Sequence, residues 1–286
     1  MSTTTLDRPA VPASIHLNFA RVVAAEVRKT FSLRSTWWTL GVAVVLQVGT
    51  AALMGLAARA ASSGEGKGPR GAGFSLDASQ VAGIGLEFSQ LAVVALAVLM
   101  ITSEYSSGQI RVSLAAVPRR TPVLAAKALV LSVVVAVLGA VGGSLSVGAA
   151  LLIGGDNVEL ALPGAETARI LAGGPLYLVG IALLSLAVGA LMRNSAGAIA
   201  TLMAFIVVVQ NVIGMILWKP LQIISPWLPG TAGSQLMATD QGVAMDRAVP
   251  DRVGAVLDPW VGYGVLIGYA VIFLVAAVVS LRSRDA

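Results

Sequence analysis

The sequence predicts an all-α polytopic membrane protein with six transmembrane helices, and two observations carry that prediction. The first is composition: 57% of the residues are hydrophobic and 12% are charged, with a mean hydropathy of +0.86, whereas soluble domains carry about 25% charged residues. The second is a set of six long stretches almost free of charge, each near the roughly 20 residues that a spanning helix needs. These stretches are too long for strands and lack two-residue alternation, so helices are the expected structure.

The expected elements follow one another from a short cytoplasmic tail at residues 1–16. An amphipathic helix at 17–34 leads into the first span, and only Met192, Arg193 and Asn194 part the fourth and fifth apolar stretches, which requires a tight turn. The expected spans are residues 35–58, 80–103, 126–153, 170–192, 195–218 and 259–281, within a transmembrane domain covering 35–286.

Lysine and arginine predict the orientation of these spans. Six spans place both termini on the same side of the membrane. With the N terminus inside, the cytoplasmic segments hold twelve of the nineteen basic residues and the outer segments hold seven. Because the loops are short, this asymmetry favours cytoplasmic termini in a plasma membrane. Topology therefore accounts for the net charge of +5 without a nucleic-acid partner.

The two longer outer loops differ in character. Residues 59–80 are rich in glycine and serine and are expected to form a flexible connector. Residues 219–258 are less polar and place Trp227 between two prolines. Two structures remain open for the first half of this loop: short helices at the outer interface, where tryptophan is favoured, or an ordinary surface loop.

Composition also limits the chemistry that this chain can carry. It has no cysteine and a single histidine, His16, which excludes a disulfide framework, thiolate metal sites and most nucleophilic catalysis. The nearest match to a phosphate-binding loop, "GEGKGPRG", lacks the required Ser or Thr after its lysine. A serine among glycines at 142–148 has no intramembrane histidine or lysine beside it to act as a base. We therefore expect no enzyme activity and no cofactor bound by this chain.

The stretch before the first span predicts an amphipathic helix lying at the membrane surface. Arg21 and Arg28 fall on one side of this helix, opposite an apolar side. Glu26 is an exception because its direction falls inside the apolar arc. It either pairs with Lys29 one turn on, which is the favoured interpretation, or meets a protein partner. The apolar side consists of Phe19, Val22, Val23, Val27 and Phe31.

A second amphipathic stretch follows the second span. Ile110, Leu114 and Val117 fall at i, i+4 and i+7 and form one apolar stripe. Pro118 ends this helix of two to three turns, and basic residues follow at its carbonyl end, where cations suit the helix dipole. The pattern alone favours a positively charged topology anchor beside acidic lipids over a docking face for a protein partner.

Two segments resemble the membrane subunits of ABC transporters of the type-2 (ABC-2) permease family. The first is "EVRKTFSLRSTWWTL", with a glutamate, a lysine three residues later, a basic stretch and paired tryptophans entering the first span. The second is "EYSSGQIRVSLAAVPRRTPVLAAK", with Glu-Tyr, a glycine, a short helix, Pro-Arg-Arg and a lysine opening the third span. The resemblance covers nearly the whole chain.

The resemblance implies a permease subunit of an ATP-driven exporter. It implies that the helix before the first span is an elbow helix containing Glu26 and Lys29, and that the helix between spans two and three is a coupling helix that docks a separate ATPase. Two ATPase copies with ATP and Mg, and a second permease subunit in a homo- or heterodimer, are the implied partners. The implied docking residues are Glu104, Tyr105, Gly108, Ile110, Arg111, Leu114, Pro118, Arg119 and Arg120.

Polar residues within the spans leave a different function open. Glu87 interrupts the second span, where a carboxylate costs a few kcal/mol; it either marks a transport path or lies near the outer surface. Gln210 and Asn211 in the fifth span either hydrogen-bond between helices or contact cargo. Little fixed charge in the spans favours an amphipathic or lipid-like cargo such as a drug, antibiotic, peptide or lipid. The alternative function is a gradient-driven secondary transporter or channel-like protein that uses Glu87.

Overall fold

The computed structural model describes residues 18–62, 76–108, 120–209, 212–213, 218–249 and 254–283. Within these residues, five helices are long and apolar enough to cross a membrane, which confirms an all-α, multi-pass membrane protein. The five are α2 (Arg34–Ser62), α3 (Ala78–Ser106), α5 (Arg120–Gly154), α6 (Gly164–Met192) and α12 (Pro259–Ser283).

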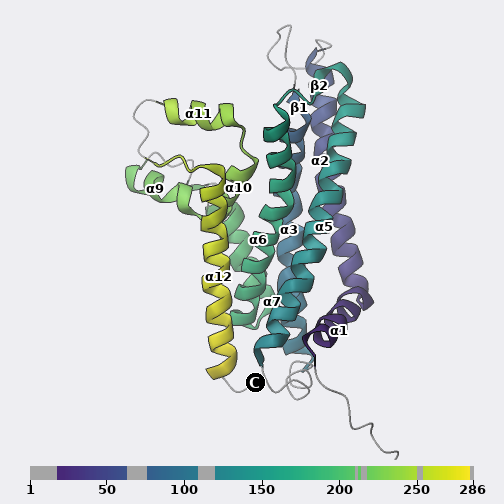
Figure 1. Ribbon diagram of the computed structural model, residues 1–286, viewed down its shortest axis with the longest axis vertical. Coiled ribbons are helices and arrows are strands. Elements are labelled where there is room, and N and C mark those ends of the chain that lie inside the picture. Colours follow the sequence, from purple (N-terminus) through teal and green to yellow (C-terminus); the bar gives the residue numbers. More distant parts are fainter. Residues whose placement is uncertain are drawn as a thin grey trace, which may run out of the picture.

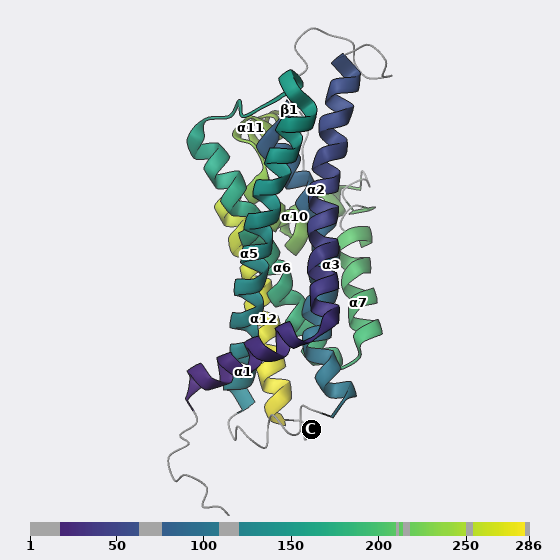
Figure 2. The same ribbon diagram turned by 90° about the vertical axis from the view of Figure 1, so that its right-hand side faces the viewer.

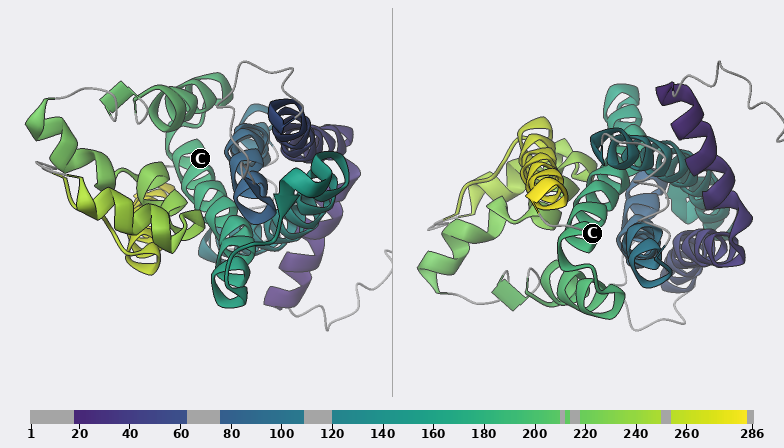
Figure 3. Two further views of the ribbon diagram at one scale, coloured as in Figure 1. Left: turned by 90° about the horizontal axis from the view of Figure 1, so that it is seen from above. Right: turned by 90° about the horizontal axis from the view of Figure 1, so that it is seen from below.

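The long helices stand side by side in one bundle (Figure 1). Helix α3 is central and packs against α2, α5 and α6, while α12 packs against α6 on the opposite side of the bundle from α2 (Figure 3). Buried apolar residues of α3 and α6 supply most of the core. In the most apolar 18-residue stretch of each of these two helices, 61% of the residues are buried. The corresponding share is 22% in α2 and in α12. Helices α2 and α12 therefore form the periphery of the bundle.

Close helix contacts in this bundle depend on small residues. A Cβ atom at Gly85 of α3 would lie 2.5 Å from the backbone oxygen of Gln47 in α2, and one at Gly139 of α5 would lie 2.8 Å from the Cα of Pro175 in α6. Both distances are shorter than real Cβ contacts. Glycine at these positions lets the backbones approach, as is common between membrane helices.

Helix α1 (Phe19–Ser32) lies across one end of the bundle and is steeply inclined to α2 (Figure 2). Asn18 caps its start by accepting a hydrogen bond from the amide of Ala20. Leu33 is extended and breaks the helix, and α2 begins at the next residue. The indole of Trp37 donates to the carbonyl of Phe31 across this break, at 3.1 Å. We call this end of the molecule the α1 end and the opposite one the far end.

The fifth predicted span is described only in part. Helix α7 (Ser195–Met203) continues into the π-helical segment η2 (Ala204–Val209), and this apolar helix is shorter than a spanning helix. The predicted tight turn before it is formed by Arg193, which has a positive φ of 53°, and by Asn194, whose side chain accepts from the amide of Gly197. Gln210 and Asn211 lie outside the described residues.

The loop before α12 folds into short helices rather than an irregular chain. These are α9 (Lys219–Ile224), η3 (Ser225–Trp227), α10 (Pro229–Ser234), η4 (Gln235–Met237) and α11 (Asp240–Ala248). Helix α10 is buried against α6 and α12, where Gly233 touches Tyr177 and Leu266. From α6, Arg169 donates to the carbonyls of Leu236 (3.0 Å) and Ala238 (2.8 Å), which ties the loop to the bundle.

At the far end, two short strands join the tips of α3 and α5. Strand β1 (Leu76–Asp77) pairs in parallel with β2 (Val158–Glu159), which follows the 3-10 turn η1 (Gly155–Asn157). The carboxylate of Asp77 caps α3 and accepts two backbone amides after β2, at 2.9 and 3.1 Å. Burial alone would raise the pKa of Asp77, but the Ser79 hydroxyl and these backbone donors hold it below its ordinary value of 3.8.

Candidate functional site

Four charged residues meet at the α1 end of the bundle, and we call them the ionic cluster: Glu26, Lys29, Glu104 and Lys127. The Nζ of Lys127 lies 2.6 Å from a carboxylate oxygen of Glu26 and 2.6 Å from one of Glu104. Lys29 also donates to Glu104. The cluster holds two carboxylates and two ammonium groups, so its formal charges balance.

Each member of the cluster comes from a place where a helix meets the end of the bundle. Glu26 lies in the middle of α1, on the side that also carries the buried Thr30. Glu104 lies in the last turn of α3, and Lys127 lies two turns into α5. The cluster therefore ties the crossing helix α1 to the two upright helices that flank residues 109–119.

Burial makes this cluster energetically sensitive. The side chains of Lys127 and Glu104 are each 1% exposed, and that of Glu26 is 7% exposed. A buried ion pair is a weak net stabiliser, but removing one partner leaves an uncompensated buried charge and costs about 3–5 kcal/mol. Lys29 is 30% exposed, so its contribution is smaller. The three buried members therefore hold the helices in a defined arrangement.

A small cavity with a mainly apolar lining borders the cluster between α1, α2, α3 and α5. Its volume is about 280 Å³, and Glu26, Lys29 and Lys127 are among its lining residues. Thr36 and Thr39 of α2 and Ser103 of α3 supply further polar groups. The charged groups of the cluster therefore border a small hollow at the α1 end.

A further basic side chain, outside the cluster, lies beside it. The guanidinium of Arg193, in the turn between α6 and α7, lies 5.2 Å from the ring centroid of Tyr105 at the end of α3. A cation over an aromatic face at this distance is attractive. Because Tyr105 follows Glu104 directly, the end of α3 contacts α1 and α5 through one residue and the α6–α7 turn through the next.

The structure brings together some of the predicted site residues. Glu26, Lys29 and Glu104 form the ionic cluster, and Tyr105 is adjacent to it. The favoured interpretation of Glu26 is wrong: it bonds to Lys127 rather than to Lys29, because its side of α1 faces α5. Gly108 has a positive φ of 70° just after the C-cap of α3, a conformation that favours glycine.

Other predicted residues cannot be placed in this way. The proposed docking residues Ile110, Arg111, Leu114, Pro118 and Arg119 lie outside the described residues, and Arg120 is described only as the first residue of α5.

Lys127 is the residue that sequence reasoning missed as a site residue. It was noted only as a lysine that opens the third span. Two signals in the sequence point to it. Lys127 is followed by an apolar stretch that reaches Gly154. In addition, Glu104 at the end of the preceding span needs a cation when it is buried. Neither signal shows that the cation would contact α1 as well, because Glu26 is 101 residues away in the chain.

Glu87 is not part of the ionic cluster. Residues 87 to 104 of α3 cover about 25 Å at 1.5 Å per residue, against a hydrocarbon core of about 30 Å. Glu87 is therefore separated from the ionic cluster along α3 by most of the thickness of such a core. Its side chain is exposed and lines a pocket of about 440 Å³ between α3 and the α10–α11 region, with Gln80, Thr239 and Asp246 among the other lining residues.

The middle of the bundle holds a few buried polar groups. The hydroxyl of Tyr177 donates to the side-chain oxygen of Gln90 at 2.6 Å, which joins α6 to α3. Among the described residues, Gln47, Ser89 and Ser146 are fully buried and have side-chain polar atoms without a hydrogen-bond partner. No group of three or more potential metal ligands occurs in the part of the chain that the structure describes.

No protein-family model matches this chain, and no curated protein matches it either.

Proposed function

We propose that this chain is the membrane-spanning permease subunit of an ATP-driven exporter, of the type-2 ABC class that its sequence resembles. The chain forms the translocation path, and a separate ATPase subunit supplies the energy. Two permease chains, identical or different, pair in the plasma membrane and bind two ATPases, which carry ATP and Mg. Both termini face the cytoplasm, so the α1 end is the cytoplasmic end.

The observation that carries this proposal is the position of the ionic cluster. Residues 109–119, the proposed coupling helix, are preceded by Glu104 and followed by Lys127, and these two residues bond to each other at 2.6 Å. The same lysine bonds to Glu26 of α1, the proposed elbow helix. A push on residues 109–119 is therefore transmitted to α1, α3 and α5 together, as a rigid-body movement of packed helices requires.

The path of the chain supports a sixth span. Helix α6 ends at Met192 at the α1 end, whereas α12 starts at Pro259 in the far half of the molecule and returns to the α1 end (Figure 1). The chain between them must cross back, and α7 with η2 begins that crossing. A full span here agrees with the charge asymmetry, which puts both termini on one side.

The test is the attachment of the ATPase. The complex is purified from native membranes through a tag on this chain, and ATP hydrolysis is measured in the eluate. Asp replacing both Ile110 and Leu114 should remove the hydrolysing partner while the permease stays in the membrane. The matched control replaces both Gln109 and Ala116 with Asp, which adds the same two charges away from the apolar stripe and should retain the partner. Equal retention in both variants would refute docking through this stripe.

The gradient-driven alternative rests on Glu87 and its 440 Å³ pocket. That function requires transport to fail in Glu87→Gln and to continue without an ATPase. Because the ATP-driven function needs no proton or cation site at Glu87, we expect Glu87→Gln to leave transport within about twofold of wild type. Transport in vesicles holding only this chain and an ion gradient would favour the alternative.

A further inference from the structure

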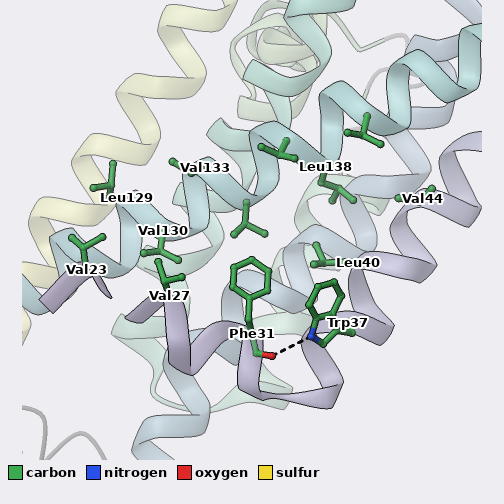
Figure 4. A pocket seen from close by; sticks show the side chains of 13 residues that line it. Val23, Val27, Phe31, Trp37, Leu40, Val44, Leu129, Val130, Val133 and Leu138 are labelled. Carbon is green, nitrogen blue, oxygen red and sulfur yellow. Dashed lines mark hydrogen bonds between the residues drawn. The ribbon is translucent and has the colours of Figure 1, made fainter. Parts of the chain in front are cut away.

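An apolar groove runs along the outside of the bundle where α1, α2 and α5 meet (Figure 4). Val23, Val27 and Phe31 of α1 form its lower wall, and α5 forms its back. Its volume is about 600 Å³, within the range of about 300–1,000 Å³ of small-ligand sites. The remaining lining residues are Trp37, Leu40, Val44, Leu129, Val130, Val133, Val134, Val137, Leu138 and Val141.

The chemistry of the lining calls for a hydrocarbon. Every lining side chain is Val, Leu, Phe or Trp, and the one polar group, the indole N–H of Trp37, already donates to the carbonyl of Phe31. A helix of a second copy is a poor occupant because close contacts between membrane helices use small residues, and the groove has none. A flexible chain of methylene groups fits a wall of branched side chains.

The length of the groove is close to the thickness of one leaflet of a bilayer. Its back wall is an exposed stripe on α5, from Leu129 (46% exposed) through Val133 (56%) to Val141 (50%). This stripe is about 18 Å long at 1.5 Å per residue, against about 15 Å for half of a hydrocarbon core. Trp37 and Trp38 stand at the α1 end of the groove, 58% and 77% exposed, as tryptophans do at the headgroup level.

Charge next to the groove selects the headgroup. Helix α1 presents three sides: the groove side with Val23 and Val27, the side that joins the ionic cluster, and an exposed side with Arg21 and Arg28. By helical geometry Arg28 lies next to Val27, about 100° around the axis. A phosphate whose acyl chain enters the groove therefore has basic side chains at its own level.

We propose that this groove binds one acyl chain of an acidic phospholipid from the leaflet at the α1 end, with Arg28 contributing to headgroup recognition. The bound lipid fills the space between α1 and α5 and so braces the helix that carries Glu26. This site does not depend on the proposed transport function, since it requires only that the chain is embedded in a bilayer.

The test counts lipids retained by the purified protein. Wild-type protein in mild detergent receives phosphatidylglycerol or phosphatidylcholine with identical acyl chains, and native mass spectrometry counts bound lipid. We expect one retained phosphatidylglycerol per chain, at least tenfold weaker retention after Val133→Trp fills the groove, and no change in the control Ile272→Trp on the exposed side of α12. Arg28→Gln should reduce the preference for phosphatidylglycerol without reducing phosphatidylcholine retention. Unchanged retention in Val133→Trp would overturn the proposal.

Two further readouts keep the proposal open to refutation. If Val133→Trp leaves lipid retention unchanged but turns a dimer into a monomer, the groove is occupied by a second copy and the proposal is wrong. If Val133→Trp fails to fold, a second measurement uses protein that keeps Val133. Brominated phosphatidylglycerol is added to this protein, and the quenching of its tryptophan fluorescence is measured. Trp37→Phe should then lose more of the fluorescence quenching than Trp38→Phe, because Trp37 lines the groove and Trp38 does not. Equal losses would contradict the site.

Discussion

Replacing Lys127 with methionine is the sharpest test of the ionic cluster. Methionine keeps much of the length of the side chain but removes the ammonium group, which leaves the carboxylates of Glu26 and Glu104 without their shared partner. Both bonds are 2.6 Å long, and the lysine side chain is 1% exposed. Lys29 still donates to Glu104 in this variant, so Glu26 is the carboxylate that loses its ion-pair partner.

The expected loss follows from burial. Removing one partner of a buried ion pair costs about 3–5 kcal/mol, and a lysine shared by two carboxylates belongs near the upper end. At about 2–4 °C per kcal/mol for a chain of this size class, the midpoint of thermal unfolding should fall by about 6–20 °C. The assay is far-UV circular dichroism of the protein in detergent, followed with increasing temperature.

The control variant is Lys219→Met, because Lys219 is exposed at the start of α9. Its unfolding midpoint should change by about 2 °C or less, since a surface substitution stays within about 0.5 kcal/mol. A double variant, Lys127→Met with Glu26→Gln, should recover part of the loss because it removes the carboxylate charge that Lys127→Met leaves without its ion-pair partner. If Lys127→Met were no less stable than Lys219→Met, the cluster would not hold the helices together.

Two further perturbations test other parts of the fold. Gly85→Ala places a Cβ atom 2.5 Å from the backbone of Gln47, so we expect a loss of about 1–3 kcal/mol in the same thermal assay; Gly41→Ala, with nothing within 4 Å, should be near neutral. Asp77 has a lowered pKa in the folded protein, so its hydrogen bonds stabilise the far end above pH 3.8 and that contribution is lost as the pH falls below this value. Wild type should therefore lose more stability than Asp77→Asn between pH 5 and pH 3, and parallel curves would contradict the role of Asp77.

The helices were predictable because each carries its signal locally. A long apolar stretch in a bilayer must satisfy its backbone groups internally, and this alone predicts a helix. The amphipathic helix before the first span was likewise expected at 17–34 and is found at Phe19–Ser32.

The candidate site was only half predictable. Glu26 was noticed as a carboxylate on the wrong side of an amphipathic helix, but its partner was assigned to the nearest lysine in the chain. A local pair at i, i+3 is visible in a sequence, whereas the contact with Lys127 depends on how α1 crosses the end of α5. The same applies to the groove: Val27 and Phe31 were assigned to one apolar side, and only the position of α1 shows that this side, with α5, encloses a hollow.

The sequence by itself determined that this protein is helical, lies in a membrane and carries a basic, amphipathic helix before its first span. These properties depend on composition and on periods of a few residues, so they survive any arrangement of the helices. Only the tertiary structure decided which charges neutralise one another and which apolar surfaces remain open. Those outcomes depend on contacts between residues far apart in the chain, and in a hydrocarbon core the packing of small residues and buried ion pairs, rather than hydrophobicity, sets which contacts form.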